Sequence, residues 1–83
     1  MLDDSLKRAK QKTVGLKQTQ RALEKGDVRR VYLAGDADAY VIRPVLEFCQ
    51  RLNVEIVHVD SMAELGKACG IEVGASVVGV LEE

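Results

Sequence analysis

The residues best suited to chemistry in this sequence are three polar side chains that follow a glycine. Lys17, Gln18 and Arg21 come shortly after Gly15, in a run whose apolar residues recur at helical spacing. Lys17 and Arg21 are four residues apart, so a helix places them on one exposed face with Gln18 beside them. The first N–H groups of that helix lack intrahelical partners and lie at the same end. A phosphate could therefore meet both side-chain and backbone donors there.

A second stretch, residues 70–74, places Ile71 and Val73 where a helix-like run gives way to a strand-like one. Loops usually avoid exposing such apolar surface. Apolar side chains in a loop are suited to an unstacked RNA base, and the acidic Glu72 between them argues against a purely electrostatic DNA clamp. The alternative is that Ile71 and Val73 enter the core as the first residues of the next strand.

Motifs for catalysis are missing from the sequence, which has no G-x-S-x-G, P-loop, H-E-x-x-H or G-x-G-x-x-G pattern. A Cys69–His58 pair is conceivable, but the sequence indicates no third group to orient it. No His/Cys cluster supplies a zinc site. Asp36 and Asp38 offer two of the roughly six oxygen ligands that a calcium site needs, so they are better explained as capping or turn residues. We expect no enzyme, no metal and no cofactor.

Charge is distributed unevenly along the 83 residues. Residues 1–35 contain nine Lys/Arg and four Asp/Glu, a formal charge of +5, whereas residues 36–83 contain three and nine, a formal charge of −6. These values agree with the net charge of −1 for the whole chain. Such a polarity indicates a polyanion-binding face on an otherwise acidic body, although charged helices are commonly only solvated faces.

Composition indicates a small folded domain, because 47% of the residues are hydrophobic and 30% are charged. No apolar run reaches the roughly 18–20 residues that span a bilayer, and residues 1–5 do not resemble a secretory signal. We therefore expect a cytoplasmic protein. Cys49 and Cys69 have no close spacing, so both are expected to be reduced and packed in the core, with His58 partly exposed on a strand.

Helical and strand patterns alternate along the chain. The predicted helices cover residues 4–12, 15–25, 42–53 and 61–69, and the predicted strands cover residues 28–34, 54–59 and 75–81, with a short extended link at 13–14. Pro44 sets the start of the third helix near Ile42 or Arg43, because proline inside a helix costs about 3 kcal/mol. This order predicts an α/β protein, a three-layer α/β/α sandwich around a mixed four-stranded sheet.

Three stretches resemble the ribosomal protein L7Ae family. They are Gly15-Leu-Lys-Gln-Thr-Gln-Arg-Ala-Leu-Glu-Lys-Gly26, the loop Ala34-Gly-Asp-Ala-Asp38 and, most specifically, Leu65-Gly-Lys-Ala-Cys-Gly-Ile-Glu-Val-Gly-Ala75. The resemblance covers nearly the whole chain in the right order and is strongest to the short bacterial YbxF-type members. It implies an α/β/α sandwich that binds kink-turn RNA, a sharply bent helix–internal loop–helix with tandem sheared G·A pairs. Residues 1–83 would then form a single RNA-binding domain, associated with the ribosome or with a riboswitch.

The resemblance also implies two groups of site residues. The recognition helix would be presented to the groove at the kink by Gly15, Lys17, Gln18 and Arg21. Lys17 and Gln18 would face guanine edges there, and Arg21 the bases or phosphates nearby. The loop that covers the flipped nucleotide would consist of Ile71, Glu72 and Val73.

One position departs from the family pattern. Many archaeal and eukaryotic relatives carry Asn-Glu where this chain has Lys17-Gln18. A glutamate accepts hydrogen bonds from guanine as an anion, and such charge-assisted bonds are roughly twice as strong as neutral ones. Gln18 lacks that charge, while Lys17 adds a cation that favours phosphate. We therefore expect a steeper salt dependence of RNA binding than in those relatives.

The expected partner is RNA, with no DNA and no membrane, and the protein is expected to be a monomer. The main alternative is a structural ribosomal or protein-interaction domain whose contact with RNA is incidental. RNA binding that persists only within assembled particles would favour this alternative.

Overall fold

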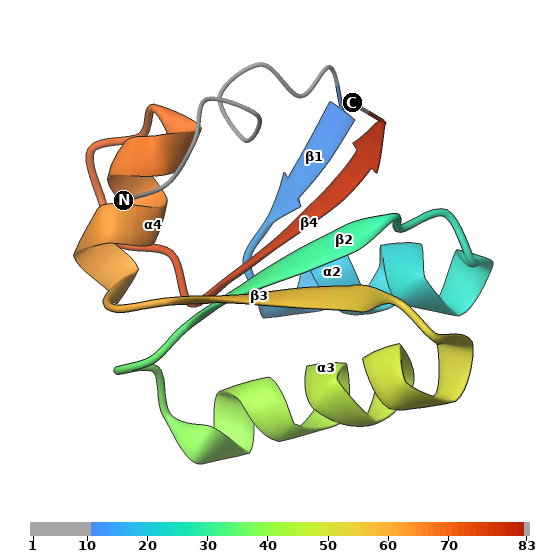
Figure 1. The fold of residues 1–83 in the computed structure, drawn as a ribbon. Coiled ribbons are helices and arrows are strands. Elements are labelled where there is room, and N and C mark those ends of the chain that lie inside the picture. The colour runs from blue at the N-terminus through green and yellow to red at the C-terminus, as the bar shows by residue number, and fades with distance from the viewer. Residues whose placement is uncertain (1–10, 83) are drawn as a thin grey trace.

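A computed structural model of the protein describes residues 11–82 (Figure 1). They form β1 (Gln11–Val14), α2 (Leu16–Lys25), β2 (Arg30–Ala34), α3 (Ala39–Leu52), β3 (Glu55–Val59), α4 (Met62–Cys69) and β4 (Val77–Glu82). The strands form one mixed sheet in the order β1-β4-β2-β3, in which β2 is parallel to β3 and β4 is antiparallel to β1 and β2. α2 and α3 lie on one face of the sheet and α4 on the other. The predicted fold class is confirmed.

The two faces of the sheet bury two separate sets of side chains. In β2, Val31 and Leu33 pack with α2 and α3, whereas Tyr32 and Ala34 pack with α4. Successive strand residues point to opposite faces, so a central strand covered on both sides is apolar at every position. Burying a valine or leucine side chain contributes about 1.5–3 kcal/mol relative to leaving it exposed. The sheet is therefore a rigid support for the loops at its ends.

All three helices of residues 11–82 begin at the same end of the sheet. β1, β2 and β3 run in one direction, since β4 is antiparallel to both of its neighbours and β2 is parallel to β3. Each of these strands is followed directly by a helix. β4 runs the opposite way, so its first residues lie at this same end, which we call the helix-start end (Figure 1).

The predicted first helix differs from the structure where the two can be compared. Residues 4–10 lie outside the described range, and the expectation that Gln11 and Lys12 are helical is wrong, because both belong to β1. β1 extends the predicted edge strand at 13–14 and pairs with β4 from Gln11 opposite Glu82 to Val14 opposite Val78. The side chain of Lys12 donates to the carbonyl oxygen of Cys69 at 3.3 Å. Backbone N–H and C=O groups of Gln11 and Lys12 are satisfied by pairing with β4, which the helical pattern of the local sequence could not indicate.

The prediction that α3 begins near Ile42 or Arg43 is also wrong, because the helix begins at Ala39 and contains Pro44. Asp38 caps it, with its side chain accepting from the backbone N–H of Tyr40 at 2.9 Å. Such a cap contributes about 1 kcal/mol. Pro44 removes only one donor close to the start of the helix, and the apolar face of the later turns, with Val45 and Cys49 buried, stabilises the rest.

Three strand starts also differ from the prediction, since β2, β3 and β4 begin one or two residues later than expected. The delay in β4 has a clear cause. The N–H of Ala75 donates to the carbonyl oxygen of Met62 at 3.0 Å, so this residue is held by α4 and not by the sheet. Gly79 in β4 is closely packed, because a Cβ there would lie 2.7 Å from Thr13 Oγ1.

The predicted states of the cysteines and of His58 are confirmed. Cys49 and Cys69 are free and buried, and His58 is an exposed residue of β3. Burial raises the pKa of both thiols, and for Cys69 nearby Lys12 opposes this effect.

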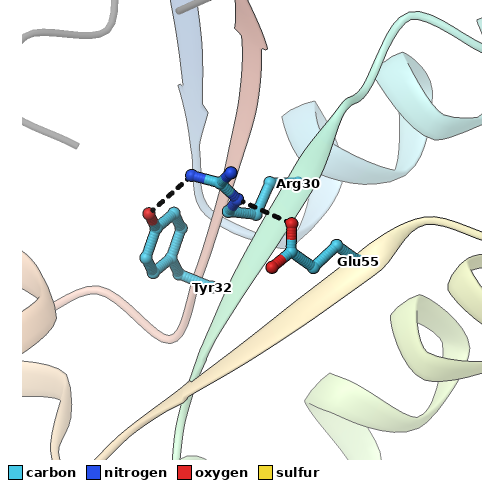
Figure 2. Close-up of polar contacts among 3 residues, drawn as sticks. All are labelled: Arg30, Tyr32 and Glu55. Carbon is cyan, nitrogen blue, oxygen red and sulfur yellow. Dashed lines mark hydrogen bonds and ion pairs between the residues drawn. The ribbon is translucent and has the colours of Figure 1, made fainter. Parts of the chain in front are cut away.

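At the opposite end of the sheet, a polar cluster joins β2 and β3 (Figure 2). Arg30 Nε donates to Glu55 Oε1 at 3.0 Å, and Arg30 Nη1 donates to the Tyr32 hydroxyl at 3.5 Å. Glu55 is well exposed, so this ion pair contributes at most about 1 kcal/mol. We assign it a structural role, because it lies away from the helix-start end.

Candidate nucleic-acid interface

The first turn of α2 begins from a backbone conformation that only glycine adopts readily. Gly15 has φ 97° and ψ 165°, in a region that costs other residues about 1–3 kcal/mol. Among the described residues, none lies within 4 Å of the position that a Cβ on Gly15 would occupy, so glycine is required here by the backbone conformation and not by lack of space. This conformation turns the chain from β1 directly into α2.

α2 presents its polar residues to solvent because its opposite face is anchored in the core. Thr19, Ala22 and Leu23 are buried, and the hydroxyl of Thr19 lies 2.9 Å from that of Thr13 in β1. The three candidate side chains on the other side of the helix, Lys17, Gln18 and Arg21, are all exposed. The helical face predicted from the sequence is thus confirmed as an exposed face.

Within residues 11–82, no side chain caps the start of α2. Gly15 has no side chain to cap the helix, and the first turn contains no acidic residue. By contrast, α3 is capped by Asp38 and α4 by Ser61, whose Oγ accepts from the N–H of Glu64 at 3.1 Å. The positive end of a helix dipole attracts anions. Among the helices of residues 11–82, α2 therefore has the start most available to an anionic ligand.

The candidate loop, residues 70–76, begins with a well-defined helix end. Gly70 adopts φ 79°, with its N–H directed to the carbonyl oxygens of Gly66 and Lys67, and the N–H of Ile71 donates to Gly66 at 3.0 Å. These two crossed bonds form a Schellman motif, which commonly places an apolar residue against the preceding helix. Ile71 follows this rule, since it is half-buried against the cluster that contains Leu65.

The second half of the loop runs back along α4. A Cβ at Gly66 would collide with the carbonyl oxygen of Val73, and a Cβ at Gly74 would lie 3.1 Å from the Cβ of Met62. The bond from Ala75 to Met62 closes this contact. The loop is thus fixed at both ends, with Glu72 exposed and the Val73 side chain 70% exposed between them.

The loop and the start of α2 meet at the beginning of β4. The N–H of Gly15 donates to the carbonyl oxygen of Val77 at 2.8 Å, directly after the loop. On the other side, the N–H of Ala34 donates to Ser76 at 3.0 Å. Two stretches about 50 residues apart in sequence therefore lie next to each other at the helix-start end, as Figure 1 shows.

The alternative assignment of the loop to the core is correct only in part. Ile71 contributes to the core, whereas Val73 does not enter it and β4 starts only at Val77. Glu72 and Val73 are therefore the exposed members of the predicted loop, and Ile71 supports them from below.

Comparison with known proteins identifies the family. The model of the Ribosomal protein L7Ae/L30e/S12e/Gadd45 family matches residues 2–83. The chain belongs to this family. An "RNA-binding protein" of Bacillus pumilus (strain SAFR-032) is 42% identical over 78 residues, covering 94% of this chain and 95% of its own length. "RNA-binding protein YbxF" of Geobacillus stearothermophilus is 47% identical over 68 residues, covering 82% and 83%.

A solved structure shows the same fold. The "Giardia lamblia 15.5kD RNA binding protein" superposes with a TM-score of 0.89 at 21% sequence identity, covering 96% of this chain and 70% of that one. The match of the family model over residues 2–83 confirms the sequence resemblance to the L7Ae family. The names of these relatives describe binding to RNA and no catalytic activity, which agrees with the expectation from the sequence.

The residues that fix the loop of residues 70–76 were not identified as site residues from the sequence. Gly66 and Met62 position Val73 and Ala75 through backbone contacts. Gly66 was a detectable signal, because a glycine inside a helix is unfavourable by about 1 kcal/mol unless close packing requires it.

Other kinds of site are not indicated within the described residues. No group of three or more His, Cys, Asp or Glu in residues 11–82 is arranged to hold a metal ion. Over the same range, none of the helices has both the length and the apolar character needed to cross a membrane. Asp36 and Asp38 serve instead as acceptors for the backbone N–H groups of Met62 and Tyr40.

Proposed function

We propose that this protein binds RNA, and that it recognises kink-turn RNA and stabilises its bent form, in association with a ribosome or a riboswitch. It would act as a monomer and as a single domain, with RNA and not DNA as its partner. One observation carries the proposal: the 2.8 Å bond from Gly15 to Val77, which joins the cationic start of α2 to the end of the apolar loop. The names of the L7Ae-family relatives support RNA as the ligand.

The start of α2 is suited to the groove at the kink. Lys17 and Arg21 supply positive charge and Gln18 can both donate and accept, so the helix can contact guanine edges and nearby phosphates together. Gly15, with no side chain and open space around it, lets the RNA backbone approach the free N–H groups of the first turn. Gly15, Lys17, Gln18 and Arg21 would thus both increase the affinity for RNA and orient the RNA on the protein.

The loop is suited to a base that has left the stack. Sequence-specific RNA recognition commonly targets bases that are splayed out and contacted by protein side chains. Val73 offers an exposed apolar surface on a backbone fixed by α4, Glu72 lies beside it and Ile71 supports it from the core. A loop fixed before binding loses little conformational entropy when the RNA arrives.

The proposal is tested by comparing two RNAs of matched length. Fluorescence anisotropy would measure binding to a labelled kink-turn duplex and to a continuous duplex without the internal loop, at the same salt concentration. We expect saturable binding to the kink-turn at submicromolar to micromolar protein and much weaker binding to the continuous duplex. Equal affinity for both RNAs would contradict kink-turn recognition, and binding to neither would contradict RNA binding.

A further inference from the structure

Three of the four large apolar side chains that are exposed in residues 11–82 lie at the helix-start end. They are Tyr40, Met62 and Val73, whereas Leu52 lies at the far end of α3. Tyr40 is 83% exposed, more than any other large apolar residue in this range. Scattered apolar residues on a surface need no explanation, but an exposed aromatic ring beside a candidate nucleic-acid interface does.

Tyr40 is linked to the candidate loop indirectly, through contacts of the residues around it. Its N–H donates to Asp38, and the neighbouring Asp36 accepts from the N–H of Met62 at 2.7 Å. Met62 in turn contacts Gly74, next to Val73. The start of α3 is therefore fixed to the start of α4 and to residues 70–76, so Tyr40 has a defined place on the same end of the molecule.

The charges around Tyr40 favour a base over a phosphate as its ligand. Asp36 and Asp38 are exposed carboxylates shortly before Tyr40 in the chain, and the carboxylate of Asp38 accepts from the Tyr40 N–H, so these charges disfavour a phosphate backbone at this point. An aromatic face attracts a nucleobase whatever the sequence, because every base has a π-face. Arg43, three residues further along α3 and exposed, lies on the same side of the helix and can compensate the carboxylates.

We propose that Tyr40 is an additional RNA contact, a platform on which an unpaired nucleobase stacks outside the loop formed by residues 70–76. This inference rests on the proposed function, and it extends the interface from α2 and the loop onto the start of α3. The occupant is a base of the same RNA, and Arg43 neutralises the phosphate that follows it. Stacking of one base on an aromatic side chain changes affinity by about 5- to 140-fold, equivalent to 1–3 kcal/mol.

The first test uses fluorescence, because the natural sequence has no tryptophan. Tyr40→Trp would place one indole at the proposed platform, and Leu52→Trp would place one at the far end of the same helix as a matched control. Titration with kink-turn RNA, excited at a wavelength that RNA does not absorb, should quench only the Tyr40→Trp protein. Equal quenching in both variants, or none in either at saturating RNA, would overturn the proposal.

The second test measures affinity. Tyr40→Ala should bind the kink-turn at least about fivefold more weakly, while Tyr40→Phe and the control Leu52→Ala should bind like the unmodified protein. Circular dichroism would confirm folding, which we expect because the ring makes little contact with the core. If Tyr40→Ala binds the kink-turn as tightly as the unmodified protein, this inference is wrong and the proposed function still stands. If the unmodified protein itself does not bind the kink-turn, the proposed function is wrong.

The third test identifies the base. A set of kink-turns, each lacking one unpaired base, would be bound to the unmodified protein and to Tyr40→Ala. At one position the missing base should weaken binding of the unmodified protein but not of Tyr40→Ala, because the two changes remove the same contact. If, for every missing base, the fold-loss of affinity is the same in the unmodified protein and in Tyr40→Ala, no base stacks on Tyr40.

Discussion

The carbonyl oxygen of Val73 occupies the space that a Cβ on Gly66 would need. This contact places the backbone of the loop directly on α4, and α4 is anchored in turn by the buried side chains of Leu65 and Cys69. Gly66 therefore positions the exposed side chain of Val73, although Gly66 has no side chain that could contact a ligand. The shape of the interface depends on a glycine inside a helix.

Gly66→Ala should displace the loop. The substitution gains about 1 kcal/mol from helix propensity, but a methyl group forced against backbone costs typically 1–3 kcal/mol, so we expect a net destabilisation or a shifted loop. RNA affinity should fall more than stability explains. Urea unfolding and RNA titration would measure both, with Ala63→Ser on the exposed side of α4 as a control. Unchanged affinity would show that the loop position does not matter for binding.

Arg21→Ala should weaken RNA binding and flatten its salt dependence. If Arg21 contacts a phosphate, the slope of log affinity against log salt should decrease in magnitude by about one unit. Lys25→Ala is the matched control, because Lys25 has the same charge and is exposed in the last turn of the same helix. Equal effects of the two substitutions would mean that only net charge matters. A weaker affinity with an unchanged slope would assign Arg21 to a base edge.

Val73→Asp and Ile71→Asp should have different consequences. Val73 is exposed, so its substitution should change stability by no more than about 0.5 kcal/mol while lowering RNA affinity about tenfold or more. Ile71 packs against the core, so placing a carboxylate there should cost about 1–3 kcal/mol of stability. Thermal unfolding and RNA titration distinguish these outcomes. Unfolding of the Val73→Asp protein would show that the loop belongs to the core.

The two cysteine thiols should be unreactive in the folded protein at neutral pH. Burial raises the pKa of Cys49 and Cys69, so each native thiol holds its proton more strongly than in the unfolded chain. The free energy of unfolding should therefore fall as pH rises above the unfolded thiol pKa of about 8.5. A thiol reagent should label both residues rapidly only in denaturant. Fast labelling of the native protein at pH 7 would contradict their burial.

Local patterns predicted much of this fold because each had a strong physical signal. α2 ends directly before Gly26 and α4 begins directly after Ser61, as these two capping residues indicate. The start of α3 was misplaced because the penalty of Pro44 was weighed without the cap from Asp38. Gln11 and Lys12 were misplaced because their strand exists only through pairing with β4, which lies about 70 residues later.

The candidate site could be predicted by residue type but not by its arrangement. Exposure of Lys17, Gln18 and Arg21 followed from helical spacing. The bond from Gly15 to Val77 and the contact of Gly66 with Val73 depend on sheet order and on the path of the loop, which no local pattern contains. Tyr40 was not identified, because one aromatic residue near a helix start has no distinctive spacing.

We expect the start of α2 and the adjoining loop to act together to hold RNA in a bent form. The most direct measurement is energy transfer between dyes on the two helical ends of a kink-turn RNA, in low magnesium, as protein is added. Energy transfer should rise saturably with the unmodified protein, and rise less or not at all with Arg21→Ala or Val73→Asp. No change in transfer while anisotropy shows that the RNA is bound would contradict this expectation.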